Sequence, residues 1–201
     1  MFVTFEGGEG TGKSTQVKLL ADRLRSQGRD IVATREPGGT PEGETLRSLL
    51  VSGDAHWSAT AEALLNYAAR DVHLTHIIRP ALAKKQTVIC DRFMDSTRAY
   101  QGYAGGCDFT LIDQLEQVIV NDTRPDLTLI FDLDPKLGLA RAKARGNEAE
   151  DRFERKGLAF HEKLRSGFLA IAQGDPKRCR LIDAAQPIDE VAAQIWQALN
   201  G

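Results

Sequence analysis

Residues 7–15 read GGEGTGKST, a stretch that combines four glycines with a lysine and neighbouring hydroxyl side chains. Gly7, Gly12, Lys13 and Ser14 have the spacing G-x-x-x-x-G-K-[ST] of a phosphate-binding loop, or P-loop. Glycines allow backbone N–H groups to turn toward phosphate oxygens. In this pattern the lysine reaches the β- and γ-phosphates, and the serine hydroxyl ligates Mg²⁺. The stretch therefore predicts nucleoside triphosphate binding; the alternative is a glycine-rich turn with an incidental lysine.

The flanking residues predict the strand and helix that such a loop requires. Residues 2–6 form a short apolar run typical of a buried strand. After the loop, apolar residues recur at helical spacing until Gly28, a good residue for ending a helix. The amino end of that helix adds partial positive charge beside the loop, which favours a bound phosphate.

Strand and helix patterns alternate along the rest of the chain. Further strands are predicted over 30–36, 86–92, 126–134 and 178–183. Helices are predicted over 41–51, 59–85 with a kink or restart at Pro80, 95–101, 109–121, 136–145, 157–172 and 188–200. This alternation predicts an α/β fold of the P-loop NTPase type, a three-layer αβα sandwich around a five-stranded parallel sheet. We expect one domain over 1–201, with a short lid segment at about 141–156.

Composition restricts the class of protein. The 201 residues carry a net charge of −2, with 27% charged and 42% hydrophobic residues, which argues against broad binding to nucleic acid. No apolar run reaches the length of a membrane span, and the chain starts directly with a strand, so we expect neither a membrane segment nor a signal peptide. Cys90, Cys107 and Cys179 lack metal-binding spacing and suit a reducing cytoplasm.

Cationic and acidic side chains follow the second and third predicted strands. Arg35 lies in TREPGGT (34–40), and Arg47 lies on the next helix. Asp91 ends an apolar strand, where a carboxylate can hold Mg²⁺ directly or through water. Arg92 beside it can clamp a phosphate with two hydrogen bonds. Because parallel strands end at one edge of the sheet, these groups should gather there. The alternative for each arginine is a surface ion pair.

A second group of cations opens the predicted lid. Arg141 and Arg145 are four residues apart in RAKARG (141–146) and share a helix face, whereas Lys143 does not. They can bring positive charge onto a transferring phosphoryl group. The alternative is a solvated basic helix end that complements the helix dipole.

Several blocks together resemble bacterial thymidylate kinases. They are FEGGEGTGKST, TREPGGT, YAARD, DRFMDSTRAYQG, RAKARG followed by EDRFE, and LIDA, and they run in order along nearly the whole chain. The TREPGGT and DRFMDSTRAYQG blocks are specific to that family, whereas the P-loop is not. The resemblance implies transfer of the ATP γ-phosphoryl group to dTMP, giving dTDP and ADP, by a homodimer with Mg²⁺.

The resemblance also assigns roles by position. It implies that ATP is bound by Gly7, Gly8, Glu9, Gly10, Thr11, Gly12, Lys13, Ser14 and Thr15, with Arg141 against adenine. It implies that dTMP is bound by Glu9, Arg35, Arg47, Asn66, Tyr67, Arg70, Arg92, Ser96, Thr97, Tyr100 and Gln101. Lys13, Arg92 and Arg145 are expected to be catalytic, and Ser14 and Asp91 to hold the metal. Within these sets, Arg92, Arg47 and Arg35 match the dTMP phosphate site, and Arg70 matches a residue that addresses thymine.

Glu9 is an acid in a loop made to hold anions. In the resembling family this acid accepts a hydrogen bond from the 3′-hydroxyl of the sugar, which suits a carboxylate that would repel phosphate. The rival role is electrostatic stabilisation of the helix amino end.

The chain also departs from the family pattern. Asn66 stands where a phenylalanine usually stacks on thymine, so either Tyr67 stacks instead or Arg70 and hydrogen bonds hold the base. Lys143 replaces a frequent lid arginine, and the pattern gives no role for Arg98.

The mechanism implied needs no general base. A phosphate monoester has a second pKa of about 6 and is already a dianionic nucleophile at neutral pH. His56, His73, His76 and His161 fall outside the motifs and are interpreted as surface or structural residues. Two other functions stay open at this point. One is phosphoryl transfer to a nucleoside or a different nucleotide, and the other is a P-loop switch or ATPase that binds a protein partner.

Overall fold

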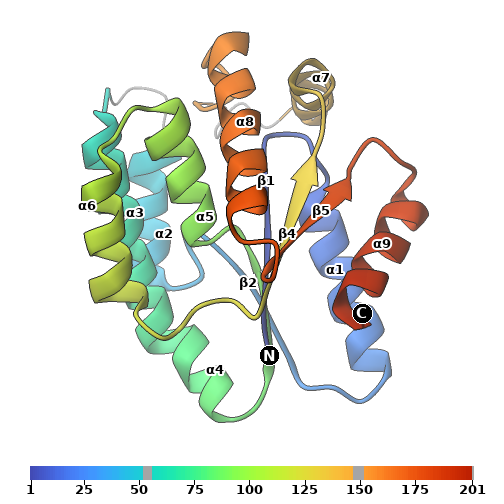
Figure 1. Cartoon of the computed structure of the whole chain (residues 1–201). Helices are drawn as coiled ribbons and strands as arrows, with labels where there is room; N and C mark the ends of the chain where they lie inside the picture. Colours follow the sequence, from blue (N-terminus) through green and yellow to red (C-terminus); the bar gives the residue numbers. More distant parts are fainter. Residues whose placement is uncertain (52–55, 147–151, 201) are drawn as a thin grey trace.

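The computed structural model describes residues 1–51, 56–146 and 152–200. Its centre is a sheet of five parallel strands in the order β2-β3-β1-β4-β5 (Figure 1). The strands are β1 (Phe2–Gly7), β2 (Ile31–Arg35), β3 (Thr87–Asp91), β4 (Leu127–Asp132) and β5 (Cys179–Asp183). All five predicted strands are present, and the α/β fold with helices on both faces of the sheet is confirmed.

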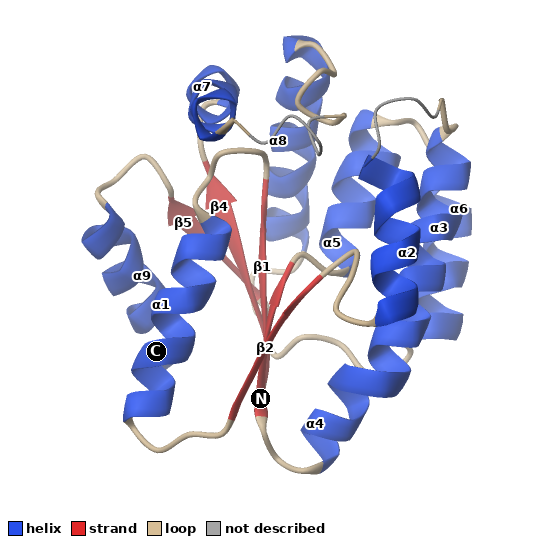
Figure 2. Ribbon diagram, turned by 180° about the vertical axis from the view of Figure 1, so that it is seen from behind, coloured by secondary structure: helices blue, strands red, loops and turns tan. Residues whose placement is uncertain are grey.

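Alternating side chains on the strands bind two helical layers to the sheet. Val3 and Phe5 point into the core beneath α1 (Lys13–Ser26) and α9 (Ile188–Asn200). Phe2 points into the opposite core, beneath α3 (Ala59–His73) and α4 (Arg79–Ala83). Both views show α1 and α9 on one side of the sheet and α2, α3, α4, α5 and α6 on the opposite side (Figure 2). The period-two pattern of the strands thus produces the three layers.

The long predicted helices are divided by wider turns. The segment 59–85 consists of α3, a π-helical turn η1 (Leu74–Ile78) and α4. Pro80 has no N–H group, and its ring would clash with the carbonyl of an unbroken helix, so the helix restarts at this position. The segment 94–104 likewise consists of α5 (Met94–Thr97) and η2 (Arg98–Ala104), and 109–120 of α6 (Phe109–Leu115) and η3 (Glu116–Val120). The second segment therefore extends past the predicted end at residue 101.

The remaining helices are α2 (Pro41–Val51), α7 (Pro135–Arg145) and α8 (Leu158–Gly174), which agree closely with the predicted ranges. Of the predicted lid, residues 147–151 lie outside the described residues, as does the side chain of Arg145. Among the described residues, no helix has both the length and the apolar character to cross a membrane.

The register brings the carboxyl ends of the strands to one edge. Arg35 pairs with Asp91 across β2 and β3, and Phe5 pairs with Asp91 across β1 and β3. Gly7 pairs with Phe131 near the end of β4. The residues that follow these strands therefore lie next to one another, as the sequence predicts, although they are far apart along the chain.

Candidate active site at the carboxyl edge of the sheet

The phosphate-binding loop (residues 7–15) depends on glycine at two close approaches. Gly7 has φ +138°, and a Cβ added there would lie 2.6 Å from the carbonyl oxygen of Phe131. Gly10 has φ +68°, and its backbone packs directly on Gly138 of α7. A Cβ added to Gly138 would lie 2.5 Å from the Glu9 carbonyl oxygen. Larger side chains at these positions would push the loop away from the sheet and from α7.

Lys13 is folded against the inside of the loop. Its Nζ donates hydrogen bonds to the Gly7 carbonyl at 3.0 Å, the Gly8 carbonyl at 2.8 Å and Thr11 Oγ1 at 3.0 Å. Burial, together with the nearby Arg92 cation, lowers the pKa of Lys13 to about 8. The hydrogen-bond partners of Lys13 Nζ in the described structure are neutral, so a phosphate bound in the loop would give it a directly contacting anion.

Ser14 and Asp91 offer the oxygen ligands of a divalent cation site. Ser14 Oγ donates a hydrogen bond to Asp91 Oδ2 at 2.6 Å, although the two residues belong to α1 and β3. A hydroxyl and a carboxylate at this separation are ligands that Mg²⁺ prefers, with water and phosphate oxygens completing its octahedral shell. The donor set therefore fits the ion that the sequence predicts.

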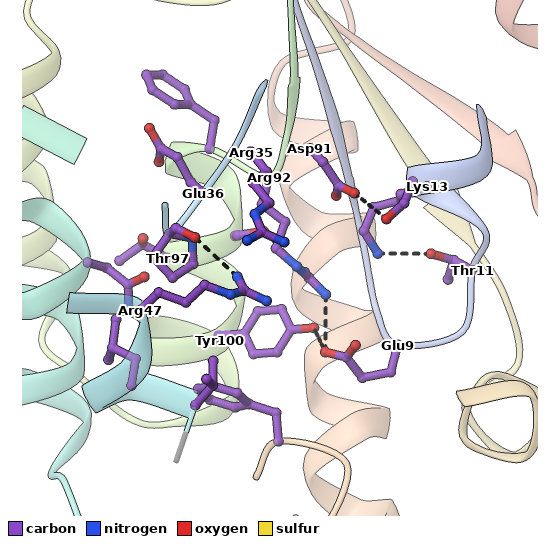
Figure 3. A pocket seen from close by; sticks show the side chains of 18 of the residues that line it. Glu9, Thr11, Lys13, Arg35, Glu36, Arg47, Asp91, Arg92, Thr97 and Tyr100 are labelled. Carbon is purple, nitrogen blue, oxygen red and sulfur yellow. Dashed lines mark hydrogen bonds and ion pairs between the residues drawn. The ribbon is translucent and has the colours of Figure 1, made fainter. Parts of the chain in front are cut away.

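Arg92 connects the loop with the opposite wall. Its backbone adopts φ +70°, a conformation uncommon outside glycine, which turns the side chain back across the end of β1. Its Nη1 donates to the Gly7 carbonyl at 2.9 Å, and its Nη2 donates to Glu9 Oε1 at 3.1 Å. Tyr100 donates its hydroxyl to the same Oε1 at 2.6 Å, as Figure 3 shows.

Glu9 is therefore an ionised acceptor. Burial alone would raise its pKa, but Arg92, Lys13 and the Tyr100 hydroxyl lower it to about 2. Both hydrogen bonds reach Oε1, and among the described residues no donor contacts Oε2. One carboxylate oxygen is thus left for a hydroxyl group of a ligand.

A second carboxyl group lies beneath this one. Glu6 is fully buried and accepts hydrogen bonds from the Phe93 N–H and from the Ser96 hydroxyl. Burial and the nearby Asp95 carboxylate raise the pKa of Glu6 to about 7. Glu6 fixes the start of the segment after β3, on which Ser96 and Tyr100 stand.

Arg70 defines the far end of the site. The guanidinium is 2% exposed; Nε donates to Glu36 Oε2 at 2.8 Å, and Nη2 donates to the Phe93 carbonyl and to Thr97 Oγ1. His73 Nδ1 lies 2.9 Å from the other oxygen of Glu36, so this histidine is structural, as predicted. Arg70 Nη1 is buried and has no hydrogen-bond partner in the described structure, which leaves a donor for a ligand.

Arg35 and Arg47 are two further cations of the site. Arg35 pairs with Glu44 at 3.0 Å on the exposed surface of α2, so the surface ion pair proposed as an alternative does form. Arg47 donates to the Pro37 carbonyl at 3.1 Å. Both side chains nevertheless line the cavity described next.

These groups surround one cavity of about 570 Å³ (Figure 3). Its lining includes residues 9–15 of the loop and most of the predicted set: Arg35, Arg47, Asn66, Arg70, Asp91, Arg92, Ser96, Thr97, Tyr100, Gln101 and Arg141. Gly7 and Gly8 are not part of this lining, and their carbonyl groups accept hydrogen bonds from Lys13. The prediction for Arg145 lies outside the described side chains.

The structure corrects the prediction for Tyr67. Its ring is fully buried in the core between α3 and the sheet and does not line the cavity. Asn66 and Arg70 are four residues apart and share the cavity face of α3, whereas Tyr67 is turned away from that face. Tyr67 instead lies beneath Arg70, whose guanidinium carbon is 4.6 Å from the ring centroid.

The sequence analysis did not identify several residues that line the cavity, and it gave no role for Arg98. Glu36, Pro37, Leu50, Val51, Phe93, Phe153 and Glu154 also line the cavity. Glu36 lies inside the quoted TREPGGT block, which was the available signal, whereas Phe153 arrives by tertiary packing against Tyr100. Arg98, which had no predicted role, pairs with Asp113 and Glu116 and ties η2 to α6 and η3.

Comparisons with known proteins agree on one family. Residues 5–195 match the family model described as Thymidylate kinase. The chain is 55% identical over 195 residues to a thymidylate kinase of Caulobacter vibrioides, covering 96% of this chain and 93% of that protein. It is 51% identical over 201 residues to one of Magnetococcus marinus, covering 100% and 95%. A crystal structure of thymidylate kinase from Ehrlichia chaffeensis superposes with TM-score 0.82 at 38% identity, covering 100% and 98% of the two chains.

The raised pKa of Glu6 predicts a pH-dependent stability. The folded chain keeps this proton up to about pH 7, whereas an unfolded glutamate loses it near 4.5, so the buried group favours folding less as pH rises through that window. Relative to Glu6→Gln, the unfolding free energy of the parent chain should fall by up to about 3 kcal/mol between these values. Urea denaturation at several pH values from 5 to 8 measures this difference, with the exposed substitution Glu190→Gln as control. A gap that stays constant over the range would contradict the assignment.

Proposed function

The chain belongs to the thymidylate kinase family and is a kinase, and we propose that its cavity transfers the γ-phosphoryl group of ATP to dTMP, giving dTDP and ADP. The observation that carries this proposal is the pair of unsatisfied groups at the acceptor end of a cavity whose other end is a phosphate-binding loop. Arg70 Nη1 is a buried donor without a partner. Gln101 Nε2 is bound to Glu62, so its carbonyl oxygen is left as an acceptor.

These two groups match the edge of thymine. Thymine presents a C4 carbonyl acceptor beside an N3–H donor, and cytosine presents the reverse at both positions. A cytosine base would therefore leave Arg70 Nη1 unpaired and place its own N3 acceptor against the Gln101 carbonyl. Unpaired buried polar groups are costly, so the proposed pocket selects thymine over cytosine.

Catalysis in this proposal is electrostatic. The dTMP phosphate is already a dianion, so the main obstacle is repulsion between two polyanions and the charge that spreads in the transition state. Lys13 is buried and the Arg92 side chain is 19% exposed, so both cations lie where little water screens their interaction with phosphate oxygens. No step needs a general base.

The other cations receive roles by position. We assign Arg35 and Arg47 to the dTMP phosphate because both line the cavity but lie outside the phosphate-binding loop. Arg141 donates to the Ala184 carbonyl at 2.9 Å, which sets it beside the loop on the side proposed for adenine. Arg145 is proposed to reach the transferring phosphoryl group from the lid at about 141–156. We propose that residues 1–201 form one domain.

Glu9 is proposed to bind the 3′-hydroxyl of dTMP through Oε2. Its low pKa keeps it an acceptor at neutral pH, and Arg92 and Tyr100 hold its position. The rival role at the helix amino end is less well supported, because the side chain turns toward Arg92 and Tyr100 rather than back to α1 (Figure 3).

Mg²⁺ is the proposed metal, held by Ser14 directly and by Asp91 directly or through water. When bound, it would neutralise charge on the β- and γ-phosphates. Around it, Ser14 and Asp91 orient the ion and Lys13 holds the loop.

A homodimer and a cytoplasmic location are also proposed. Apolar side chains are exposed on neighbouring helices of one layer: Leu49 of α2, Leu64 of α3 and Val118 of η3, the last 80% exposed. A second copy of the chain could cover them.

The three free cysteines, all buried, suit a reducing compartment such as the proposed cytoplasm. Cell fractionation that placed the protein elsewhere would contradict this location.

An acceptor panel tests the function directly. With ATP and Mg²⁺, dTMP should be phosphorylated with a kcat/KM at least about 100-fold above that for dCMP, dGMP or dAMP. Cytosine and adenine reverse the donor and the acceptor at the base end, and guanine, which has the same donor and acceptor as thymine, brings a second ring. Removal of Mg²⁺ should abolish the reaction. A coupled assay of ADP release measures each rate. Steady ATP hydrolysis that no acceptor accelerates would favour a switch or ATPase instead.

Replacement of Arg92 tests the charge argument. Arg92→Ala should lower kcat/KM for dTMP by at least about 100-fold, because both the acceptor phosphate and Glu9 lose their cationic partner. Arg98→Met is the matched control, since Arg98 is also ion-paired on this segment but does not line the cavity. Equal activity of the two variants in the same assay would remove Arg92 from the mechanism.

Val118→Glu tests the dimer. The parent chain should sediment at twice the mass of one chain, and the variant should shift toward monomer because a charge would be buried at the interface. Leu181→Glu, at an exposed position on β5, should leave the mass unchanged. A parent protein that sediments as a monomer at micromolar concentration would rule the dimer out.

A further inference from the structure

Glu62 is a buried carboxylate outside the cavity that holds three side chains at once. Its side chain is 2% exposed, and it lies on α3 one helical turn before Asn66. Oε2 accepts a hydrogen bond from Gln101 Nε2 at 2.9 Å. Oε1 accepts from Arg152 Nη2 at 2.6 Å and lies 3.4 Å from Lys156 Nζ. Neither the motifs nor the lining of the cavity includes this residue.

The carboxylate belongs to a ladder between α3 and the segment 94–104. Glu62 and Arg70 are eight residues apart on one face of α3, and their partners Gln101 and Thr97 are four residues apart on the facing segment. Arg70 Nη2 donates to Thr97 Oγ1 at 3.1 Å, and Gln101 Nε2 donates to Glu62 Oε2. The two rungs position the two groups that form the base end of the cavity.

The charge of Glu62 decides which end of the Gln101 amide it can bind. A carboxylate paired with two cations carries acceptors only, so it binds the amide through its NH₂ group. The carbonyl end of Gln101 must then point elsewhere, and among the described residues no donor contacts it. Because Gln101 lines the cavity, this oxygen is available there as an acceptor.

We propose that Glu62 is a positioning residue that fixes the orientation of the Gln101 amide and thereby selects an acceptor base with a ring N–H over one with a bare ring nitrogen. The inference rests on the proposed phosphorylation of dTMP. It adds that the selection is set by a residue that does not touch the base. A neutral side chain at position 62 would let the amide turn over and present NH₂ to the cavity, which suits the N3 atom of cytosine.

Glu62 also has a structural role that the test must separate. Arg152 donates to the Leu50 carbonyl at 2.9 Å as well as to Glu62, and Phe153 packs edge-on against Tyr100 with centroids 5.3 Å apart. Loss of Glu62 would therefore also leave a buried cation unpaired and loosen residues 152–156.

The experiment compares Arg152→Met with the double variant Glu62→Gln/Arg152→Met. Both lack the Arg152 ion pair, and the double variant has no orphaned arginine, so it is expected to fold even where Glu62→Gln alone does not. For each, kcat and KM are measured with dTMP and with dCMP, and thermal unfolding records stability. Arg152→Met should keep the parent ratio of kcat/KM for dTMP over dCMP. The double variant should lose at least about tenfold of that ratio, mainly through KM, because one hydrogen bond to the base is reversed.

Two results would overturn the proposal. One is a double variant that discriminates as well as Arg152→Met, and the other is Arg152→Met losing as much discrimination as the double variant, which would assign the effect to residues 152–156. The parent chain separates this inference from the proposed function. If the parent does not phosphorylate dTMP, the function itself fails, whereas a parent that prefers dTMP and variants that keep that preference reject only the role of Glu62.

Discussion

The ion pair between Arg92 and Glu9 is the constraint on which the site depends. It joins the residue after β3 to the middle of the phosphate-binding loop, and the same guanidinium holds the Gly7 carbonyl. A largely buried cation without a partner is costly, so Arg92 needs an acid beside it. Under the proposed function, that acid must also leave the loop free for phosphates. Glu9 meets both conditions, because its Oε1 faces Arg92 while Oε2 remains for a hydroxyl group.

Other charges in the cavity follow the same rule. Arg70 is paired with Glu36, and Lys13 is held by hydrogen bonds to the Gly7 and Gly8 carbonyls, so both cations keep their positions without bound nucleotides. The backbone of Arg92 adopts a left-handed conformation, which is uncommon for a residue other than glycine. The pairing of β1 with β3 and the hydrogen bond from the Phe93 N–H to Glu6 hold this conformation in place. A preorganised cavity of this kind can stabilise charge in the transition state without rearranging during the reaction.

Much of this arrangement could be predicted from the sequence. Apolar strands, the glycine-lysine-serine spacing and the acid after β3 follow local rules, and the parallel topology then brings Arg35, Asp91 and Arg92 to one edge. Long-range partners could not be predicted. The ladder from Glu62 to Gln101 joins residues 39 positions apart, and Phe153 reaches Tyr100 only through packing. The error at Tyr67 was avoidable, because Ala63 and Tyr67 are four residues apart and share the core face of α3.

The central claim is that two nucleotides share one cavity across the Arg92–Glu9 pair. A crystal structure of the protein with dTMP and a non-hydrolysable ATP analogue tests it most directly. The account predicts that the dTMP phosphate contacts Arg92, that its 3′-hydroxyl lies within hydrogen-bond distance of Glu9 Oε2, and that the analogue's phosphates occupy the loop around Lys13. A dTMP molecule bound outside this cavity, or with its sugar turned away from Glu9, would contradict the account.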